Sequence, residues 1–259
     1  MIGTFLTDRG KVRTHNEDAG GIFYNESNQL LAIIADGMGG HQAGDVASQM
    51  AINAMKERWE ETKRFSSPEE VETWLKKHIS EVNALIYRHA QSNKECEGMG
   101  TTIVSVVCLD EHLIIAHIGD SRCYVFRQQT IEQVTEDHSL VNALVQSGQL
   151  SKDDAATHPR RNVVLRALGS EEKVNMDVQT VPLEKGIKVL LCSDGLTDKI
   201  RDEELSEIVS EDKPIEEIGR KLIDLANERG GEDNISLILL VDDAKVEAGE
   251  KVEKRSPSQ

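Results

Sequence analysis

The sequence is poor in aromatic residues and has no long hydrophobic run. Phenylalanine, tyrosine and tryptophan make up only 3% of the 259 residues, so a core must be built mainly from leucine, isoleucine, valine and alanine. No apolar stretch approaches the roughly 18 residues needed to cross a bilayer. The N-terminal segment MIGTFLTDRGKVRTHNED lacks the apolar stretch of a secretory signal peptide. We therefore expect a soluble, cytoplasmic protein.

Basic residues are also fewer than acidic residues. Lysine and arginine total 30 against 46 aspartate and glutamate, which gives a formal net charge of −16. A general nucleic-acid binder needs cationic side chains to neutralise phosphates, and an anionic membrane surface would repel this chain. We therefore expect neither nucleic acid nor membrane as a partner. The useful question is whether some of the surplus carboxylates gather in one place.

The four cysteines show no CxxC spacing. They are Cys96, Cys108, Cys123 and Cys192, and three of them lie in or beside apolar runs, where a small thiol is typically buried. A chain of this length can bury a core large enough to fold without disulfide cross-links. We expect reduced cysteines, as in the cytosol, rather than disulfides.

Strands are predicted where short β-branched segments are bounded by turn residues. They are GTFLTD at 3–8, LLAIIA at 30–35, TTIVSVVCL at 101–109, HLIIAHIG at 112–119, RCYVFR at 122–127, VNMDVQTV at 174–181, KVLLCS at 188–193 and ISLILLV at 235–241. Only Asp110 and Glu111 separate two of these segments, which predicts a hairpin and therefore antiparallel sheets.

Helices are predicted at 43–60, after Ser67 and at 215–228. Ser67 is followed by Pro68 and then by Glu70, the pattern of a capped helix start. Apolar residues recur beyond it at helical spacing. Helices and strands come in runs and do not alternate singly, which indicates an α+β fold of layers rather than a doubly wound sheet.

Two segments stand apart from this pattern. Residues 139–172 are helix-prone and interrupt the series of strands, so we interpret them as an insertion or flap. Residues 244–259 contain few large apolar side chains, and we expect a disordered tail there. A single domain would then cover residues 1–243.

Aspartates lie at the ends of several predicted strands. Asp36 follows LLAIIA, Asp120 follows HLIIAHIG, Asp194 follows KVLLCS, and Asp233 comes just before ISLILLV. If the fold brings these carboxylates close together, they raise one another's pKa values by repulsion. A divalent cation removes that repulsion. Because no cysteine or histidine pattern accompanies them, oxygen ligation favours magnesium or manganese over zinc.

A purely structural interpretation of these aspartates also stays open, because Asp-Gly at a strand end is a common turn signal. Two familiar sites are excluded, since the sequence has neither the loop spacing of an EF-hand nor the GxxxxGK[ST] pattern of a phosphate loop. Gly39 and Gly40, shortly after Asp36, would let the backbone approach a ligand closely.

A set of short motifs makes the sequence resemble the metal-dependent protein serine/threonine phosphatases of the PPM, or type 2C, family, particularly its bacterial branch. The motifs are VRTHNEDA at 12–19, IADGMGGHQAG at 34–44, GMGTT at 98–102, AHIGDSRCY at 116–124, TEDHSL at 135–140, LCSDGLTD at 191–198 and GGEDNIS at 230–236. They occur in the family's order and span nearly the whole chain to about residue 241.

The resemblance implies roles for the residues that form the metal centre. Asp36 resembles the carboxylate that bridges two metal ions, and the carbonyl of Gly37 resembles the backbone ligand of one of them. Asp194 and Asp233 match the ligands of the other ion.

Further residues match positions around that centre. Asp18, with Glu17 beside it, matches the acidic pair that holds metal-bound water. Asp120 matches the residue that, with Asp194, completes a third metal site in bacterial members. Arg13 matches the arginine that clamps the substrate phosphate.

The resemblance also implies a fold, a reaction and partners. The fold is a four-layer αββα sandwich of two antiparallel sheets flanked by helices, with residues 139–172 as the flap beside the active site. The reaction is attack on phosphorus by a hydroxide that two Mn²⁺ or Mg²⁺ ions activate, so no protein nucleophile is needed. The partners are phosphorylated proteins and a bacterial serine/threonine kinase. We expect a monomer.

The sequence departs from the wider family at the position of the general acid. Many eukaryotic members have Asp-Gly-His, whereas this chain has Met38 as the third residue and a histidine only at His41. The leaving alkoxide would be protonated by His41, by metal-bound water or by His158 in the flap, and both histidines also have a structural interpretation. We interpret His15 and His138 as surface or loop residues.

Two other functions compete with protein phosphatase activity. A metal-dependent hydrolase of small phosphoesters or phosphodiesters would use the same oxygen ligands, although the net charge of −16 argues against nucleic-acid substrates. A binding module that kept the fold and lost turnover is disfavoured, because every expected ligand aspartate is present.

Overall fold

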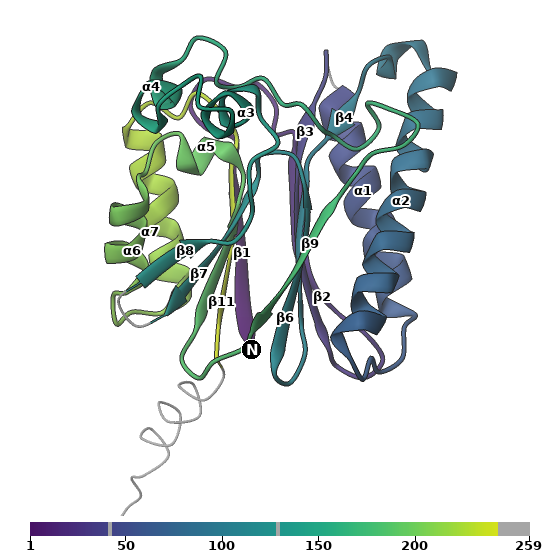
Figure 1. Cartoon of the computed structure of the whole chain (residues 1–259), viewed down its shortest axis with the longest axis vertical. Coiled ribbons are helices and arrows are strands. Elements are labelled where there is room, and N and C mark those ends of the chain that lie inside the picture. The colour runs from purple at the N-terminus through teal and green to yellow at the C-terminus, as the bar shows by residue number, and fades with distance from the viewer. Residues whose placement is uncertain (41–42, 128–129, 243–259) are drawn as a thin grey trace, which may run out of the picture.

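Two antiparallel β-sheets lie face to face at the centre of the molecule, and helices cover the outer face of each (Figure 1). The computed structural model describes residues 1–40, 43–127 and 130–242. The expected tail at 244–259 and the candidate acid His41 lie outside these described residues. The layers form the αββα sandwich of the α+β class, so the predicted fold is confirmed.

The first sheet joins the two ends of the described chain. Its strands, in spatial order, are β1 (Ile2–Asp8), β11 (Ile235–Val241), β10 (Lys188–Cys192), β7 (Arg122–Arg127) and β8 (Thr130–Gln133). The register places Ile2 opposite Val241 and Asp8 opposite Ile235. Motifs at the beginning and the end of the sequence therefore meet at one edge of this sheet.

The second sheet carries the middle of the chain. Its strands are β2 (Asp18–Tyr24), β3 (Leu30–Met38), β5 (Ile103–Cys108), β6 (His112–Ile118) and β9 (Asp177–Pro182), and the short β4 (Gly100–Thr101) pairs with the end of β3. Strands β5 and β6 pair with Cys108 opposite Leu113. The predicted hairpin at Asp110 and Glu111 is therefore confirmed.

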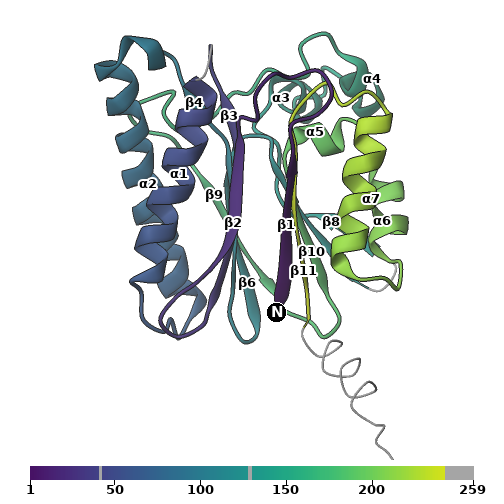
Figure 2. The ribbon, with the colours of Figure 1, turned by 180° about the vertical axis from the view of Figure 1, so that it is seen from behind.

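Helices form the two outer layers and cap one end, as the front and rear views show (Figures 1 and 2). Helices α1 (Ala43–Glu60) and α2 (Pro68–Ser92) cover the second sheet, followed by a 3₁₀ turn at Lys94–Cys96. Helices α5 (Asp194–Thr197), α6 (Asp202–Val209) and α7 (Ile215–Glu228) lie against the first sheet, while α3 (Leu140–Gln146) and α4 (Lys152–Thr157) form the helical insertion at the end of the sandwich.

The predicted helices at 43–60 and 215–228 match α1 and α7 residue for residue. The predicted start of α2 is also confirmed, because the Ser67 hydroxyl accepts from the N–H of Glu70 at 3.4 Å and Pro68 is the first helical residue. Capping by a hydroxyl satisfies one of the N–H groups that a helix start leaves unpaired.

The core is aliphatic, as the scarcity of aromatic residues predicts. Between the sheets pack residues such as Ile34, Val106, Leu191 and Leu240, all essentially inaccessible to solvent. The few aromatic side chains are concentrated near the outer helices, where Trp59, fully buried, stacks on Phe65 at 5.5 Å and meets Trp74 edge-on at 5.2 Å. Cys108, Cys123 and Cys192 are buried, as predicted.

Several predicted boundaries are wrong, and two strands are missing from the prediction. Strand β2 contains Gly20 and Gly21, which conceal the alternation of a strand. At Gly20 a Cβ would lie 2.8 Å from the ring of Phe5 in the facing sheet, so glycine permits the close approach. Strand β8 is only four residues long and mostly polar. The segment predicted at 174–181 becomes β9, which begins at Asp177.

The strand predicted at 101–109 is interrupted at Thr102. Thr102 donates its N–H to the carbonyl of Asp36 at 2.8 Å, but its hydroxyl replaces its carbonyl as the acceptor for the N–H of Asp36, at 2.9 Å. The ladder between β3 and the 101–108 segment therefore contains one side-chain hydrogen bond. This hydrogen bond is made by the backbone N–H of Asp36, one of the candidate metal ligands.

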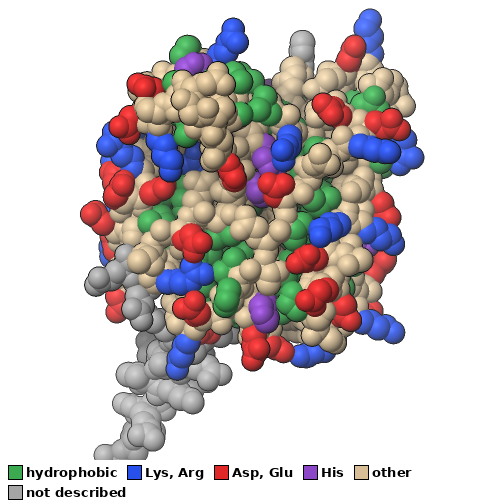
Figure 3. Space-filling view, viewed as in Figure 1, with side chains coloured by type: hydrophobic (Ala, Val, Ile, Leu, Met, Phe, Trp, Pro, Cys, Tyr) green, Lys and Arg blue, Asp and Glu red, His purple; other side chains and the backbone are tan. Residues whose placement is uncertain are grey.

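The surface shows no basic stripe on the face drawn in Figure 3, where acidic and basic side chains are interspersed. None of the helices in the described part of the chain is both long enough and apolar enough to span a membrane.

Candidate active site

The sequence-predicted residues gather at one end of the sandwich around a pocket of about 300 Å³. They line it together with two residues of the insertion. The lining includes Arg13, Glu17, Asp36, Gly37, Asp120, Asp194 and Asp233 from the predicted set, with Asn162 and Val164 from the 139–172 segment. The helical insertion therefore lies beside this pocket, as the sequence predicts for a flap.

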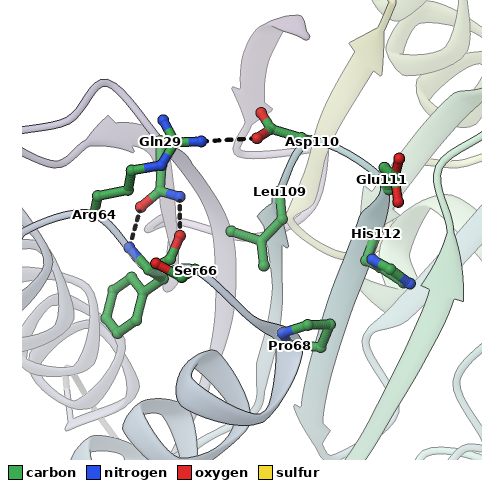
Figure 4. Close-up of a pocket in the computed structure, with 9 residues that line it drawn as sticks. Gln29, Arg64, Ser66, Pro68, Leu109, Asp110, Glu111 and His112 are labelled. Atoms are coloured by element: carbon green, nitrogen blue, oxygen red, sulfur yellow. Dashed lines mark hydrogen bonds and ion pairs between the residues drawn. The ribbon is translucent and has the colours of Figure 1, made fainter.

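A larger pocket, of about 470 Å³, lies at the other end of the sandwich (Figure 4). It adjoins Gln29, just before β3, whereas Asp36 is near the end of the same strand. Its charged groups include an exposed ion pair between Arg64 and Asp110, with the nitrogen and oxygen 2.8 Å apart. None of the predicted site residues lines this pocket.

Asp36 and Asp18 face each other on neighbouring strands. The two residues form a register pair between β3 and β2. Besides its bonds to Thr102, the backbone of Asp36 accepts a hydrogen bond from the hydroxyl of Thr101 at 2.9 Å. The two threonines of GMGTT thus fix the backbone that carries Asp36, which gives that motif a structural role.

Asp18 is buried, and only one of its carboxylate oxygens has a protein partner. Oδ2 accepts a hydrogen bond from the hydroxyl of Ser193 at 2.8 Å, and Ser193 in turn accepts from the N–H of Ser236 at 3.0 Å. Oδ1 is buried with no hydrogen-bond partner. A buried carboxylate oxygen without a partner is costly, and a bound cation, or water held by one, would satisfy it.

Asp194 and Asp233 come together because two backbones pack closely. Asp194 is the first residue of α5, and β10 ends at Cys192, one residue before the end of the predicted strand at 188–193. A Cβ at Gly195 would lie 2.0 Å from the carbonyl oxygen of Asn234, so only glycine allows this approach. The glycine after Asp194 therefore brings α5 against the segment that begins β11.

Asn234 organises the loop that carries Arg13, and the sequence analysis did not assign it a role. Its amide oxygen accepts from the N–H of Glu17 at 2.8 Å, and its amide nitrogen donates to the carbonyls of Arg9 and His15 at 2.8 and 2.9 Å. The available signal was the position of Asn234 inside GGEDNIS, one residue after a candidate ligand.

Gly37 and Asp120 complete the pocket from the second sheet. Gly37 donates its N–H to the carbonyl of Glu17 at 3.1 Å, and a Cβ on it would lie 2.1 Å from the carbonyl oxygen of Gly44. Asp120 is buried in the turn after β6. Its neighbour Ser121 shares a hydrogen bond of 2.7 Å with Thr102, which joins this turn to the backbone of Asp36.

Arg13 reaches the pocket from a loop. Its Nη2 donates to Oδ2 of Asp233 at 2.8 Å, and about half of its side chain is exposed. A half-exposed guanidinium beside several carboxylates can turn toward an anionic ligand without leaving a buried charge behind. The structure therefore brings the candidate phosphate clamp and the candidate metal ligands to one pocket.

Four aspartates in or behind the pocket have raised pKa values. Burial raises the pKa of Asp18 and of Asp120 to about 6 each. Burial and repulsion from neighbouring aspartates also place the pKa of Asp36 and of Asp194 well above the ordinary range. Carboxylates that oppose ionisation to this degree fit a site for a cation, and an all-oxygen donor set fits Mg²⁺ or Mn²⁺.

These shifts predict a pH-dependent response to metal. In the metal-free fold the raised pKa values of Asp18 and Asp120 stabilise the folded state at low pH. That contribution is lost as the pH rises through about 6, where the carboxylates ionise and repel. A divalent cation binds the ionised form. The rise in Tm caused by Mn²⁺ is therefore expected to be larger at about pH 7.5 than at about pH 5, by roughly 5 °C.

Thermal unfolding with and without Mn²⁺ measures this difference at each pH. Comparing the two states at one pH cancels the contribution of titrating groups remote from the pocket, such as His78, whose pKa is lowered by burial. Equal metal-induced shifts at the two pH values would contradict the placement of the cation among these aspartates.

The histidines differ in part from the predictions. His15 is exposed, as predicted. His138 lies in a loop, which is one of the two predicted alternatives, but it is buried and not on the surface. His158 ends α4, where its Nδ1 accepts from the N–H of Arg160 at 3.1 Å, and it does not line the pocket. That bond favours the structural interpretation of His158 over a role as general acid.

Known proteins match both the sequence and the structure of this chain. The family model described as protein phosphatase 2C matches residues 7–239. The chain belongs to the protein phosphatase 2C family. The serine/threonine phosphatase stp of Listeria monocytogenes is 48% identical over 240 residues, which covers 93% of this chain and 95% of the relative.

Solved structures of family members share the same fold. The serine/threonine phosphatase Stp1 from Staphylococcus aureus is 41% identical with a TM-score of 0.89, and the match covers 93% of this chain and 94% of that one. The catalytic domain of the serine/threonine protein phosphatase PstP in complex with two manganese ions is 31% identical with a TM-score of 0.78, covering 92% of this chain and 96% of that one.

Proposed function

We infer that this chain removes phosphate from phosphoserine and phosphothreonine in other proteins. By family it is a metal-dependent serine/threonine protein phosphatase. The observation that carries the inference is the pocket in which Asp36, Asp194 and Asp233 converge beside Arg13, with an unpartnered oxygen of Asp18 buried behind it. Such a site needs cations, and the arginine at its rim suits an anionic substrate.

We propose that two Mn²⁺ or Mg²⁺ ions occupy the pocket. Asp36 would contact both ions, the carbonyl of Gly37 would bind one, and Asp194 and Asp233 would bind the other. The manganese complex of PstP, which has the same fold, supports this number of ions.

We also propose roles for the outer carboxylates. Asp18 and Glu17 would accept hydrogen bonds from water held by the ions, which gives the free Oδ1 of Asp18 its partner. Asp120, with Asp194, would complete a third site. These two residues lie close enough that repulsion from Asp120 contributes to the raised pKa of Asp194.

The bound ions would supply a water acidified to near neutral pH and positive charge beside the phosphate. The residues of this chain then bind and orient the substrate. Arg13 would leave Asp233 and donate to the phosphoryl oxygens, where paired guanidinium hydrogen bonds fix orientation and offset charge. His41, or water in the pocket, stays the proposed proton donor for the leaving oxygen.

The remaining proposals concern organisation and partners. We propose that residues 1–243 form one catalytic domain with 139–172 as its flap, that the enzyme acts as a monomer, and that it opposes a serine/threonine kinase. The matched relatives include serine/threonine phosphatases of bacteria, which supports a bacterial signalling role.

The test is phosphate release from matched peptides. Phosphoserine and phosphothreonine peptides are expected to be hydrolysed with Mn²⁺ at least about 10²-fold faster than with a chelator. The phosphotyrosine version of the same peptide is expected to react more slowly. Hydrolysis that does not respond to the chelator, or that is confined to small phosphate esters, would overturn the proposal.

A further inference from the structure

The segment Thr135–His138 holds the turn around Asp120 by contacts from three of its residues. The hydroxyl of Thr135 accepts from the N–H of Cys123 at 3.0 Å. Asp137 accepts from both Nε and Nη2 of Arg122, at 2.9 and 2.7 Å. His138 bonds to Gly119, the residue before Asp120. The segment is therefore built against 119–123 and not against solvent.

His138 binds both polar groups of the Gly119 backbone. Its own N–H donates to the carbonyl of Gly119 at 2.9 Å, and its ring Nδ1 accepts from the N–H of Gly119 at 3.1 Å. Gly119 has a φ of +107°, and a Cβ there would lie 2.6 Å from the methyl of Thr102. The position of Asp120 thus depends on a turn that only glycine can form at residue 119 and that His138 holds from one side.

His138 also holds the end of the 139–172 flap that returns past the pocket. Its carbonyl accepts from the N–H of Leu165 at 2.7 Å, and the N–H of Leu140 donates to the carbonyl of Val163 at 2.8 Å. The residues between these two bonds on the return segment include Val164, which lines the pocket. The base of the flap is therefore closed by pairing with His138 and Leu140.

Two charged residues lie beside the outer nitrogen of the same ring, and one of them, Asp177, can accept its proton. Nε2 of His138 lies 3.2 Å from Oδ2 of Asp177 and 3.1 Å from Nη1 of Arg166, a residue of the flap. Arg166 and Asp177 also approach each other at 3.6 Å. Because Nε2 carries the ring proton when Nδ1 accepts from Gly119, Nε2 donates to Asp177, and Arg166, which can only donate, is held by Asp177 and not by the ring. One imidazole thus touches the Asp120 turn with Nδ1 and reaches the flap from Nε2 through the pair of Asp177 and Arg166.

His117, His138 and Asp177 offer ligand atoms within 4.8 Å of one another, which suggests a metal site. The hydrogen bonds argue against one. Because a backbone N–H can only donate, the Nδ1 of His138 must accept from Gly119, and the neutral ring then carries its proton on Nε2. That nitrogen has no lone pair for a metal. His117 likewise donates its Nε2–H to the carbonyl of Glu136 at 2.9 Å.

We propose that His138 is a positioning residue that couples the base of the flap to the turn carrying Asp120. Movement of the flap would be transmitted through the ring to Gly119, and so to the carboxylate that completes the third metal site. This inference rests on the proposed function only in that Asp120 is taken as a metal ligand.

Three substitutions separate the two sides of the ring. In His138→Asn the amide oxygen can replace Nδ1 as acceptor for Gly119, while the contacts of Nε2 are lost. Asp177→Ala removes an outer contact alone. His138→Ala removes both sides. The matched control is His78→Ala, a partly buried histidine on α2 whose ring bonds to Glu81 and does not touch the site.

Hydrogen exchange of the metal-free proteins measures how firmly the flap is held. Amides of 140–165 are expected to exchange about 10-fold faster in His138→Asn, Asp177→Ala and His138→Ala, as for the loss of one hydrogen bond. Exchange in His78→Ala should match wild type there. Because this measurement needs neither metal nor turnover, it stays informative even if wild-type protein shows no phosphatase activity.

Titration with Mn²⁺, followed by calorimetry and by activity, measures the effect on the metal site proposed to include Asp120. His138→Ala is expected to weaken the lowest-affinity Mn²⁺ by about 10-fold and leave the tighter ions within about 2-fold, whereas His138→Asn and Asp177→Ala should keep all affinities. Wild-type exchange in all three variants, or equal weakening of every ion in His138→Ala, would overturn the proposal. If His138→Ala does not fold, loss of the weakest Mn²⁺ in His138→Asn would also overturn it.

Discussion

Replacing Asp36 by asparagine is expected to lower Mn²⁺-dependent turnover of a phosphothreonine peptide by about 10³-fold or more. Asp36 lines the pocket, and the proposed site has no other residue that contacts both ions. Loss of the ions removes several kcal/mol of transition-state stabilisation and the acidified water. Calorimetric titration should show that Mn²⁺ binding is lost together with activity.

The same substitution is expected to stabilise the metal-free protein. Burial and repulsion raise the pKa of the Asp36 carboxyl, so removing its charge relieves a cost in the folded state at neutral pH. A higher Tm without metal together with lost turnover would exclude misfolding as the cause. Asp212→Asn, at an exposed position between α6 and α7, is the control and should leave both quantities unchanged. Retained Mn²⁺ binding in Asp36→Asn would contradict the assignment.

Replacing Arg13 by alanine is expected to lower kcat/KM by about 10²-fold. Two charge-assisted hydrogen bonds to phosphoryl oxygens are together worth about 3 kcal/mol, which corresponds to that factor. Arg13→Lys should recover only part of the loss, because an ammonium group cannot reproduce the paired geometry. Steady-state kinetics on a phosphopeptide, with KM and kcat determined separately, measure the effect.

The Mn²⁺ affinity of Arg13→Ala distinguishes a role in substrate binding from a general structural role. Arg13 is bonded to Asp233 in this structure, so its removal is expected to leave Mn²⁺ affinity unchanged or slightly higher. Arg9→Ala is the control, since Arg9 is an exposed arginine of the same loop that does not line the pocket. Loss of Mn²⁺ binding in Arg13→Ala, or full activity at low substrate concentration, would contradict the role as a phosphate clamp.

Much of this fold could be predicted because its signals are local. A hydroxyl cap with proline marks the start of α2, and the tight Asp110–Glu111 turn marks the β5–β6 hairpin. Strand β2 could not be found in this way, because Gly20 and Gly21 conceal its alternation; Gly20 serves contact with the facing sheet, and Gly21 makes room for the ring of Phe23 in the same strand. The limits of β4 and β5 depend on Thr102, whose hydroxyl acts in place of a backbone carbonyl.

Some residues of the candidate site could also be predicted from local signals, and others could not. The candidate ligand aspartates Asp36, Asp120, Asp194 and Asp233 stand out in the sequence, with Arg13, as charged residues within motifs, and the structure places them around one pocket. Asn234 and His138 act through backbone groups of residues far away in the sequence, so their partners become visible only once the two sheets are assembled. The sequence predicts His138 as a surface or loop residue, and the structure shows it in a loop but buried.

The surplus of carboxylates has two different origins. Most of the acidic residues in the part of the chain that the structure describes lie at the solvated surface, and on the face drawn in Figure 3 they are interspersed with lysines and arginines. A small group, which includes Asp18, Asp36 and Asp120, lies in or behind the pocket with raised pKa values, and Oδ1 of Asp18 has no hydrogen-bond partner. That group carries the inference of a metal centre.

The most direct test is the anomalous scattering of manganese in crystals of the enzyme grown with Mn²⁺. Two strong anomalous peaks are expected in the pocket, one between Asp36 and Gly37 and the other between Asp36, Asp194 and Asp233, with any third peak beside Asp120. Peaks at His117, His138 and Asp177 instead, or a pocket without manganese at saturating concentration, would contradict the proposed catalytic centre.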